Sequence, residues 1–437
     1  MKNSFLIIFF LITAKISTAN CIDTLVIPNA EVLVKLGLKN NSNLKISKLK
    51  ISQSSYDYKA SNYFKTPQIS GTFSSEDNLK LPTTAVPGAL VGQPGKFINV
   101  SFGKPFTNSI GISAVQSVMD WQRIFQSKIA NQNTQLLKAQ EEQTIQNLKL
   151  QILQTYYAII TSYSAIKISK KDLQLSDSIV KIIEYKFNSG IIDESSFNLA
   201  KVNSNNIKQN IIQSTILLNQ SIAYLKNLID LPVSTDLQFI LPEQLIVLNK
   251  KPLQEIGSNK SLLPLLQLVK IDSLQIKEAK ARYFPKFNLL GYKGYDQFRD
   301  NLGIDFSKGS WNDYSFISLM ATLPIYSGFL NKNKVKSMMY KKEVSKEQLR
   351  YATQQSMLND QNLLENYQST VELIEISKDN FELLNKITTA NFEKYINGLI
   401  SLDLYFKSFE DYLKSENIYL NLVSNLQIIN SNFEARN

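Results

Sequence analysis

Apolar residues recur at every seventh position through a long stretch of the chain's first half. The series is Ile145, Ile152, Ile159, Ile166, Leu173, Val180 and Phe187. A seven-residue apolar repeat is typical of helices that wind around one another in a left-handed supercoil. Residues 109–187 contain no proline and only one glycine, Gly111. The pattern therefore predicts one long helix over residues 109–187.

The second half of the chain repeats this pattern 208 residues later. The segment around Gly190, Tyr185 to Ile192, resembles the segment around Gly398, Glu393 to Ile400. The positions that match the apolar series are Tyr367, Ile374, Phe381, Thr388 and Tyr395. We therefore expect a second long helix over 328–395, a turn at each glycine, return helices over 194–228 and 402–429, and shorter leading helices over 42–63 and 261–284.

Strands are predicted ahead of each long helix. Residues 97–103 and 314–323 alternate apolar with polar side chains, as half-buried strands do. Pro105 and Pro324 follow these segments, where a residue without an N–H can end a strand. The sequence predicts β-hairpins over 67–106 and 285–323. Segments of about ten residues with one apolar face suit membrane-spanning β-strands.

These elements divide the chain into two repeats behind a targeting signal. Residues 1–19 have a basic start, a short apolar stretch and small residues before a cleavage site, so we predict a cleaved signal peptide. The first repeat is expected over 20–240 and the second over 258–437, with a connecting, equatorial segment at 241–257. Cys21 is a candidate for lipidation, but Asn20 stands where a small residue is preferred, which leaves an incidental thiol as the alternative.

Composition excludes most catalytic chemistry. The chain has no His and one Cys, which excludes His-based acid–base catalysis, Ser-His-Asp or Cys-His nucleophiles, and zinc sites built from His and Cys. A hydrolase that uses only carboxylates remains conceivable, but no segment predicts a compact fold with a cleft. We expect no enzyme activity, no cofactor and no metal.

The net charge of +11 does not indicate nucleic-acid binding. Only five of the 48 basic residues are Arg, the side chain that reads bases and phosphates in a two-pronged fashion. The Lys residues are scattered among Asn and Gln, without a basic run. We therefore expect a solvated Lys-rich surface, with anionic membrane lipid as a second interpretation of the charge and no nucleic-acid partner.

The order of these motifs resembles the TolC family of outer-membrane efflux proteins. The resemblance rests on the signal peptide, the duplicated helix–hairpin–helix–helix unit, the prolines after the strands, and the aromatic-x-x-Gly-Leu/Ile-Ile pattern with a small residue ten positions later, Ala200 and Ser408. It implies a mainly α-helical fold with membrane β-strands. Three chains would form a twelve-stranded β-barrel in outer-membrane lipid, continuous with a long α-helical barrel that extends into the periplasm.

The resemblance also implies a function. Such a homotrimer is a passive exit duct of a tripartite efflux or type I secretion system, gated at its periplasmic tip. A periplasmic adaptor, also called a membrane fusion protein, and an inner-membrane transporter would dock there. The implied docking residues at the hairpin tips are Phe187, Asn188, Ser189, Gly190, Tyr395, Ile396, Asn397 and Gly398.

The gate is a feature at which this sequence departs from the family pattern. Well-known members of the family carry an Asp six residues past the second glycine, where this chain has Leu404. The nearby acids are Asp403, Asp193 and Glu194, which become the gate candidates. The alternative is that these acids are ordinary charges at helix N-termini and that the glycines are left-handed helix caps.

A different class of function also fits the heptads and the signal peptide. A soluble periplasmic coiled-coil scaffold or adaptor would have both features, but it leaves the symmetrically placed strands unexplained. The sequence does not indicate the cargo, nor whether the partner pump is proton-driven, an ABC exporter or a metal-efflux transporter.

Overall fold

A computed structural model describes residues 24–92, 94–240, 257–307 and 309–436. The predicted signal peptide, Cys21, and the connecting segment apart from residue 257 lie outside these residues. The chain divides into two compact units, which do not coincide with the sequence repeats. We call residues 1–44, 145–258 and 360–437 the helical unit, and residues 45–144 and 259–359 the sheet unit. Each unit takes segments from both halves of the chain.

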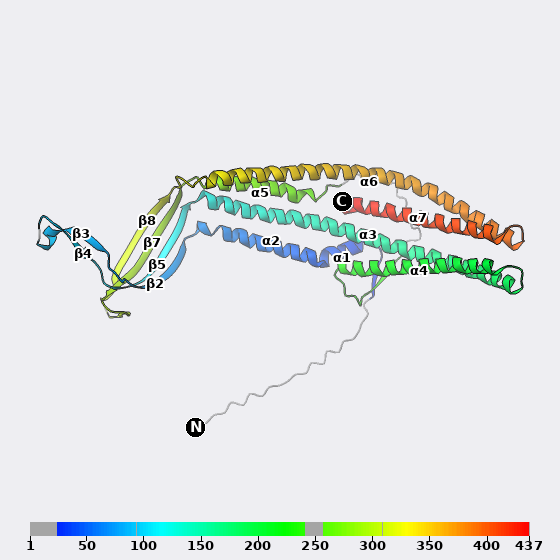
Figure 1. The fold of residues 1–437 in the computed structure, drawn as a ribbon, viewed down its shortest axis with the longest axis horizontal. Helices are drawn as coiled ribbons and strands as arrows, with labels where there is room; N and C mark the ends of the chain where they lie inside the picture. The colour runs from blue at the N-terminus through cyan, green and yellow to red at the C-terminus, as the bar shows by residue number, and fades with distance from the viewer. Residues whose placement is uncertain (1–23, 93, 241–256, 308, 437) are drawn as a thin grey trace, which may run out of the picture. The chain divides into compact units, whose positions relative to one another are not determined.

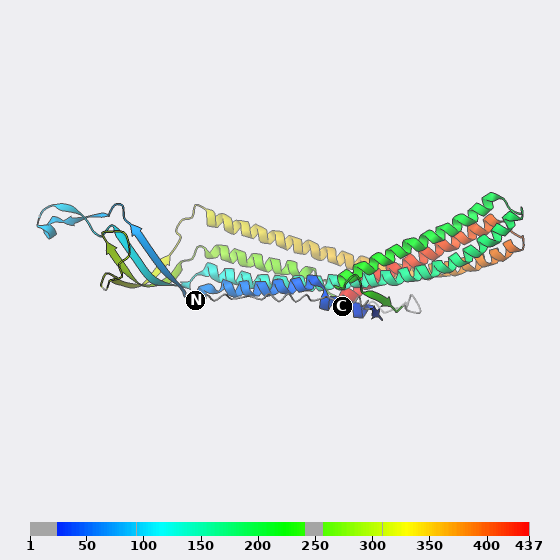
Figure 2. The same ribbon diagram turned by 90° about the horizontal axis from the view of Figure 1, so that it is seen from below.

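The helical unit contains two helical hairpins and a small parallel β-pair. Its elements are β1 (Thr24–Ile27), α1 (Ala30–Asn40), the C-terminal part of α3 (Trp121–Asn188), α4 (Glu194–Leu228), β6 (Asp236–Phe239), the C-terminal part of α6 (Leu330–Ile396) and α7 (Leu402–Arg436). Helix α4 returns along α3, and α7 returns along α6 (Figure 1). The two hairpin turns lie at the same end of this unit in both views (Figures 1 and 2).

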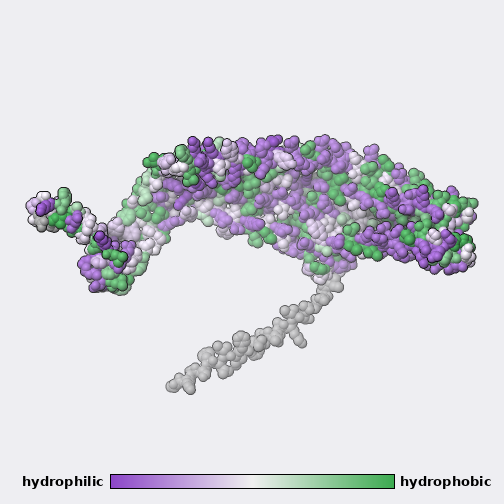
Figure 3. Space-filling model, in the orientation of Figure 1, coloured by the Kyte–Doolittle hydropathy of each residue, from purple (hydrophilic) through white to green (hydrophobic). Residues whose placement is uncertain are grey.

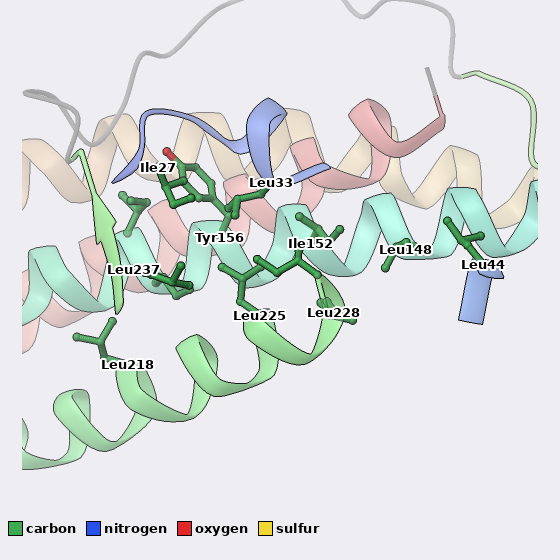
Figure 4. Close-up of a cluster of buried hydrophobic side chains, with 13 residues drawn as sticks. Ile27, Leu33, Leu44, Leu148, Ile152, Tyr156, Leu218, Leu225, Leu228 and Leu237 are labelled. Carbon is green, nitrogen blue, oxygen red and sulfur yellow. The ribbon is translucent and has the colours of Figure 1, made fainter. Parts of the chain in front are cut away.

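The core of the helical unit lies where α1 and the β-pair cover the α3–α4 hairpin. Ile152 and Tyr156 from α3 meet Leu225 from α4 and Leu33 from α1 in one buried cluster (Figure 4). Ile152 and the adjacent Ile159 belong to the seven-residue series and are fully buried. The apolar series therefore faces other helices, as a packed seam requires.

The sheet unit contains the strands and the leading helices. Its elements are α2 (Ser42–Ser61), the 3₁₀ turn Tyr63–Lys65, β2 (Gln68–Asp77), β3 (Thr83–Pro87), the 3₁₀ turn Gly88–Val91, β4 (Phe97–Ser101), β5 (Phe106–Met119), α5 (Leu262–Ala281), β7 (Lys286–Arg299), β8 (Asn312–Thr322) and the N-terminal parts of α3 and α6. Four antiparallel strands form one sheet in the order β2-β5-β7-β8. Strands β3 and β4 form a separate ribbon that projects from the sheet (Figure 1).

The structure corrects the first predicted strand pair. The segment predicted as a membrane strand, 97–103, lies in the β3–β4 ribbon, and the strand that enters the sheet is β5, which begins after Pro105. The helix predicted from residue 109 therefore begins at Trp121. Asp120 caps it, since the N–H of Arg123 donates to Asp120 Oδ1 at 3.1 Å.

Residues 109–119 form a strand because they pair with β2 on one side and β7 on the other. Gly111 lies opposite Gly294 of β7, and the ring of Tyr292 crosses both glycines. A Cβ on Gly111 would clash with the Tyr292 hydroxyl. Gly111, which interrupts the predicted helix, is thus a strand residue, and its missing side chain leaves room for the Tyr292 ring.

The other predicted helices agree with the structure at most of their ends. Helix α4 has the predicted bounds, and α2, α5 and α6 begin and end within three residues of theirs. Helix α7 starts as predicted at Leu402 but continues to Arg436 instead of ending at 429. In Figure 3 the surface over the helices mixes hydrophilic side chains with hydrophobic patches.

The two faces of the four-stranded sheet differ in polarity. Alternation along each strand, combined with the observed register, sorts the side chains. The more apolar face is exposed and carries Ile69, Phe73, Ile110, Ile112, Leu289, Ile317 and Leu319, although Lys293 and Asp313 also lie on it. The opposite face carries Ser70, Thr72, Ser74, Ser109, Ser113 and Asn288, and the hydroxyls of Ser70 and Ser113 lie 2.8 Å apart. On β7 and β8 this opposite face also carries the aromatic residues Tyr292, Tyr314 and Phe316. No helix among the described residues is both long enough and apolar enough to cross a membrane.

Candidate functional site

The first hairpin turn is built on a glycine in the left-handed conformation. Gly190 has φ +69°, which a residue with a Cβ adopts only with strain. Its N–H donates to the carbonyl of Phe187 at 2.9 Å, and the N–H of Ile191 donates to the carbonyl of Lys186 at 2.9 Å. These bonds satisfy the last carbonyls of α3, so the predicted left-handed cap is confirmed.

The second turn has the same geometry. Gly398 has φ +73°, and its N–H donates to the carbonyl of Tyr395 at 3.0 Å. The N–H of Leu399 donates to the carbonyl of Lys394 at 2.8 Å. The sequence similarity around the two glycines thus reproduces one backbone turn twice.

The three gate candidates all lie at helix N-termini. Asp193 caps α4, because its Oδ1 accepts the N–H of Ser196 at 3.0 Å. The side chain and the backbone N–H of Ser196 hold the pKa of this carboxyl below its usual value. Glu194 and Asp403 lie in the first turns of α4 and α7, where a negative charge is favoured by the helix dipole.

The cap of the second return helix uses a different residue. Ser401 stands 208 residues after Asp193, and its hydroxyl accepts the N–H of Leu404 at 3.4 Å. Asp403 is therefore not a cap, and its exposed side chain projects from the first turn of α7. Within the described residues, no ion pair joins Asp403, Asp193 or Glu194 to a lysine. Within one chain, the described residues therefore supply no lysine partner for the three gate candidates.

A lysine and a tyrosine connect the two hairpins instead. Lys186, near the end of α3, places its Nζ 4.3 Å from the ring centroid of Tyr395, near the end of α6. A cation over an aromatic face is worth about 0.5–2 kcal/mol, depending on its exposure to water. No signal in the sequence identifies the Tyr395 ring as the partner of Lys186.

An aromatic core lies directly behind the turns. Tyr405 is fully buried, and its ring lies 5.5 Å from that of Phe392 and 6.1 Å from that of Phe409. The cluster also includes Ile179, Ile183, Phe197, Ala200, Ile207, Tyr395, Leu402 and Phe406. Residues of α3 and α4 therefore pack against residues of α6 and α7. The signal that would have revealed this core is the aromatic spacing of three and four residues along α7.

The core also changes which tip residues can meet a partner. Phe187 stacks on Phe197 at 5.0 Å, and Tyr395 is only 6% exposed, so both predicted docking residues pack inside the tip. Asn188, Ser189, Gly190, Ile396, Asn397 and Gly398 remain exposed. Three apolar residues that the sequence analysis did not select, Tyr185, Ile191 and Leu399, are at least 66% exposed at the same turns. In the described part of the chain, no three acidic or thiol side chains gather as a metal site would require.

Solved structures of outer-membrane channels share this fold. A crystal structure of CusC matches with a TM-score of 0.75 at 16% identity, over 93% of this chain and 91% of that one. The Campylobacter jejuni CmeC outer membrane channel matches with a TM-score of 0.75 at 14% identity, over 93% and 85%. The open state of the Neisseria gonorrhoeae MtrE outer membrane channel matches with a TM-score of 0.73 at 15% identity, over 94% and 89%.

These identities are low, so the likeness by itself establishes the fold. No curated protein matches the sequence. The family model described as "Outer membrane efflux protein" matches residues 33–229, from α1 through the end of α4. The predicted mainly helical fold with β-strands is confirmed, and the family match favours the channel over the soluble scaffold. Over residues 33–229 the chain is similar to the outer membrane efflux protein family, and by this match together with the shared fold it is a non-enzymatic efflux channel of the outer membrane that extends into the periplasm.

Proposed function

We propose that three copies of the chain assemble into one passive exit duct, which a periplasmic adaptor and an inner-membrane transporter engage at the hairpin tips. The observation that carries the proposal is the open four-stranded sheet. Among the residues that the structure describes, its edge strands, β2 and β8, each pair on one side only. Unpaired backbone groups at the edges cost several kcal/mol each in hydrocarbon, so the edges need partners.

Three copies provide those partners. Joining β8 of one copy to β2 of the next closes a twelve-stranded barrel, whereas four strands are too few to close alone. The exposed apolar face, with Ile110, Ile112 and Ile317, then meets lipid, and the face with Ser70 and Ser113 lines the water-filled interior.

The tips supply the docking and gating part of the proposal. Two identical turns present exposed apolar side chains, Tyr185, Ile191 and Leu399, beside the flexible-backbone glycines. A partner helix can bury such side chains in a groove. Asp403 and Glu194 are exposed beside them and close the entrance by contacts between neighbouring copies. Exposed ionic contacts are weak, which suits a closure that docking must release.

The assembly is tested by cross-linking the protein in isolated membranes. We expect it in the outer-membrane fraction as a trimer. Recovery of monomers alone would contradict the shared barrel.

The docking role is tested by Gly398→Pro, with Gly398→Asn as its matched control. Proline removes the N–H that reaches Tyr395 and cannot adopt the positive φ, whereas Asn tolerates the left-handed conformation. We expect normal trimer yield for both variants, loss of export complementation for Gly398→Pro, and retention for Gly398→Asn. Full complementation by Gly398→Pro would remove the turn from the docking surface.

A further inference from the structure

Two acids are buried together between the hairpins of the helical unit. Asp172 lies on α3 and Glu416 on α7, so each hairpin contributes one carboxyl group. They are 6% and 4% exposed, and their side chains are hydrogen-bonded to each other. The Tyr412 hydroxyl donates to Asp172 Oδ1 at 3.4 Å. Neither the docking surface nor the barrel uses these groups.

No cation neutralises the pair inside the unit. Among the described residues, the charged or titratable groups that act on it are Lys171 on α3, which is exposed, and Tyr412 on α7. From α6, the ring of Phe381 stacks on Tyr412 at 5.5 Å and offers no charge. Apart from the contact between the two carboxyl groups, the buried oxygens Asp172 Oδ2 and Glu416 Oε1 have no hydrogen-bond partner in the part of the chain described. Two buried negative charges in contact would be strongly unfavourable.

One shared proton removes that conflict. Burial and the neighbouring Asp172 charge raise the pKa of Glu416 to about 8. Burial also raises the pKa of Asp172, but the hydrogen bonds from Glu416 and Tyr412 and the charge of Lys171 oppose the rise. Near neutral pH the protonated Glu416 therefore donates to the Asp172 carboxylate, as in other acid pairs that share a proton.

We propose that this pair is a proton-dependent contact that holds the second hairpin on the first: with one proton between Asp172 and Glu416 the helices pack, and its loss drives α3 and α7 apart. The extension to gating rests on the proposed function, in which packing of the hairpins closes the entrance. The duct would then open more readily as the periplasm becomes alkaline.

The direction follows from linkage. A carboxyl whose pKa is raised in the packed state stabilises that state fully below its ordinary pKa of 4.5, and the contribution is lost as pH rises through about 8. Separation exposes Glu416 to water and returns its pKa to the ordinary value. Between pH 6 and pH 9 the equilibrium should shift toward the separated hairpins by about 100-fold.

Hydrogen exchange of the purified full-length protein tests the contact. Amides of residues 165–180 and 410–422 would be followed at pH 6 and pH 9, with each rate corrected for its intrinsic pH dependence. We expect wild-type exchange to rise by up to about 100-fold at pH 9. Glu416→Gln keeps the shape and the donor but cannot ionise, so its exchange, corrected in the same way, should be the same at pH 6 and pH 9 and no faster than that of the wild type at pH 6. Glu410→Gln, which replaces an exposed acid on the same helix, should behave as wild type.

Exchange that is independent of pH in the wild type, or equally pH-dependent in Glu416→Gln, would overturn the proposal. Asp172→Asn provides a second variant in case Glu416→Gln folds poorly; it removes the neighbouring charge but leaves Glu416 buried, so it should weaken the pH dependence, and a dependence as strong as in the wild type would count against the pair. Conductance of the reconstituted protein would be recorded in parallel over the same pH range. Absence of conductance at every pH would count against the proposed duct alone, because exchange reports on the hairpin contact by itself.

Discussion

Tyr405 offers the sharpest test of the aromatic core that packs the tip. Its side chain is fully buried, with ring centroids of Phe392, Tyr395 and Phe409 at 5.5, 6.2 and 6.1 Å. Truncating a buried aromatic side chain to alanine costs about 3–5 kcal/mol through lost burial and the cavity that remains. Because the ring contacts both α6 and α7, Tyr405→Ala should loosen the tip well before it affects the sheet unit.

Tyr405→Phe is the matched control and has the opposite expected sign. The Tyr405 hydroxyl is buried without a hydrogen-bond partner among the described residues. Burying an unsatisfied hydroxyl costs about 1–3 kcal/mol, so removing it while keeping the ring should stabilise the tip by about 1 kcal/mol. The two variants thus separate the contribution of the ring from the penalty of the hydroxyl.

Local hydrogen exchange of α7 measures both effects. Opening free energies convert to exchange rates at about tenfold per 1.4 kcal/mol, so Tyr405→Ala should speed exchange of residues 402–412 by at least about 100-fold. Tyr405→Phe should slow it by about fivefold. Unchanged exchange in Tyr405→Ala would refute the aromatic core as the element that packs α7 at the tip, and faster exchange in Tyr405→Phe would show that the hydroxyl has a partner.

Three further predictions concern the seam, the gate and the sheet. Ile166→Asp should lower trimer yield at a cost of several kcal/mol per chain, because it places a charge in a packed seam, whereas Lys167→Asp on the exposed side should be tolerated; equal yields would refute the seam. Asp403→Ala should raise single-channel conductance, and wild-type conductance would place the gate elsewhere. Gly111→Ala should impair assembly, since its Cβ would clash with an aromatic ring, while Gly71→Ala, which has open space, should assemble normally in the same cross-linking assay.

The helices were predictable because their packing is periodic. A seam that repeats every seven residues constrains many positions of α3 at once. The end of that seam at Gly190 then placed the start of α4, which spans Glu194–Leu228. Gly190 and Asp193 together marked where one helix ends and the next begins, since a left-handed residue and an N-cap are both local requirements. Such signals do not depend on the distant parts of the chain.

Strand β5 was not predictable in the same way. Its segment reads as a mixture of Ser, Gly and Ile, and the preceding segment 97–103 alternates more clearly. What selects β5 is its pairing with β7, in which Tyr292 covers Gly111. That contact joins residues 181 positions apart, and strand preference depends on such neighbours more than on the local sequence.

The buried position of Glu416 could have been predicted from the spacing of buried residues along α7. Along α7 the buried or half-buried positions follow Tyr405, Phe409 and Tyr412 at spacings of four and three, and Glu416 falls on the next step. An acid on an apolar stripe carries a desolvation cost that an exposed acid does not. Asp172 stands in the same relation to the stripe of α3, four residues before the buried Ser176. In the sequence, each acid is only a polar residue at a buried position of its helix. The packing of α3 against α7 brings the two carboxyl groups together, so that one proton between them removes the repulsion.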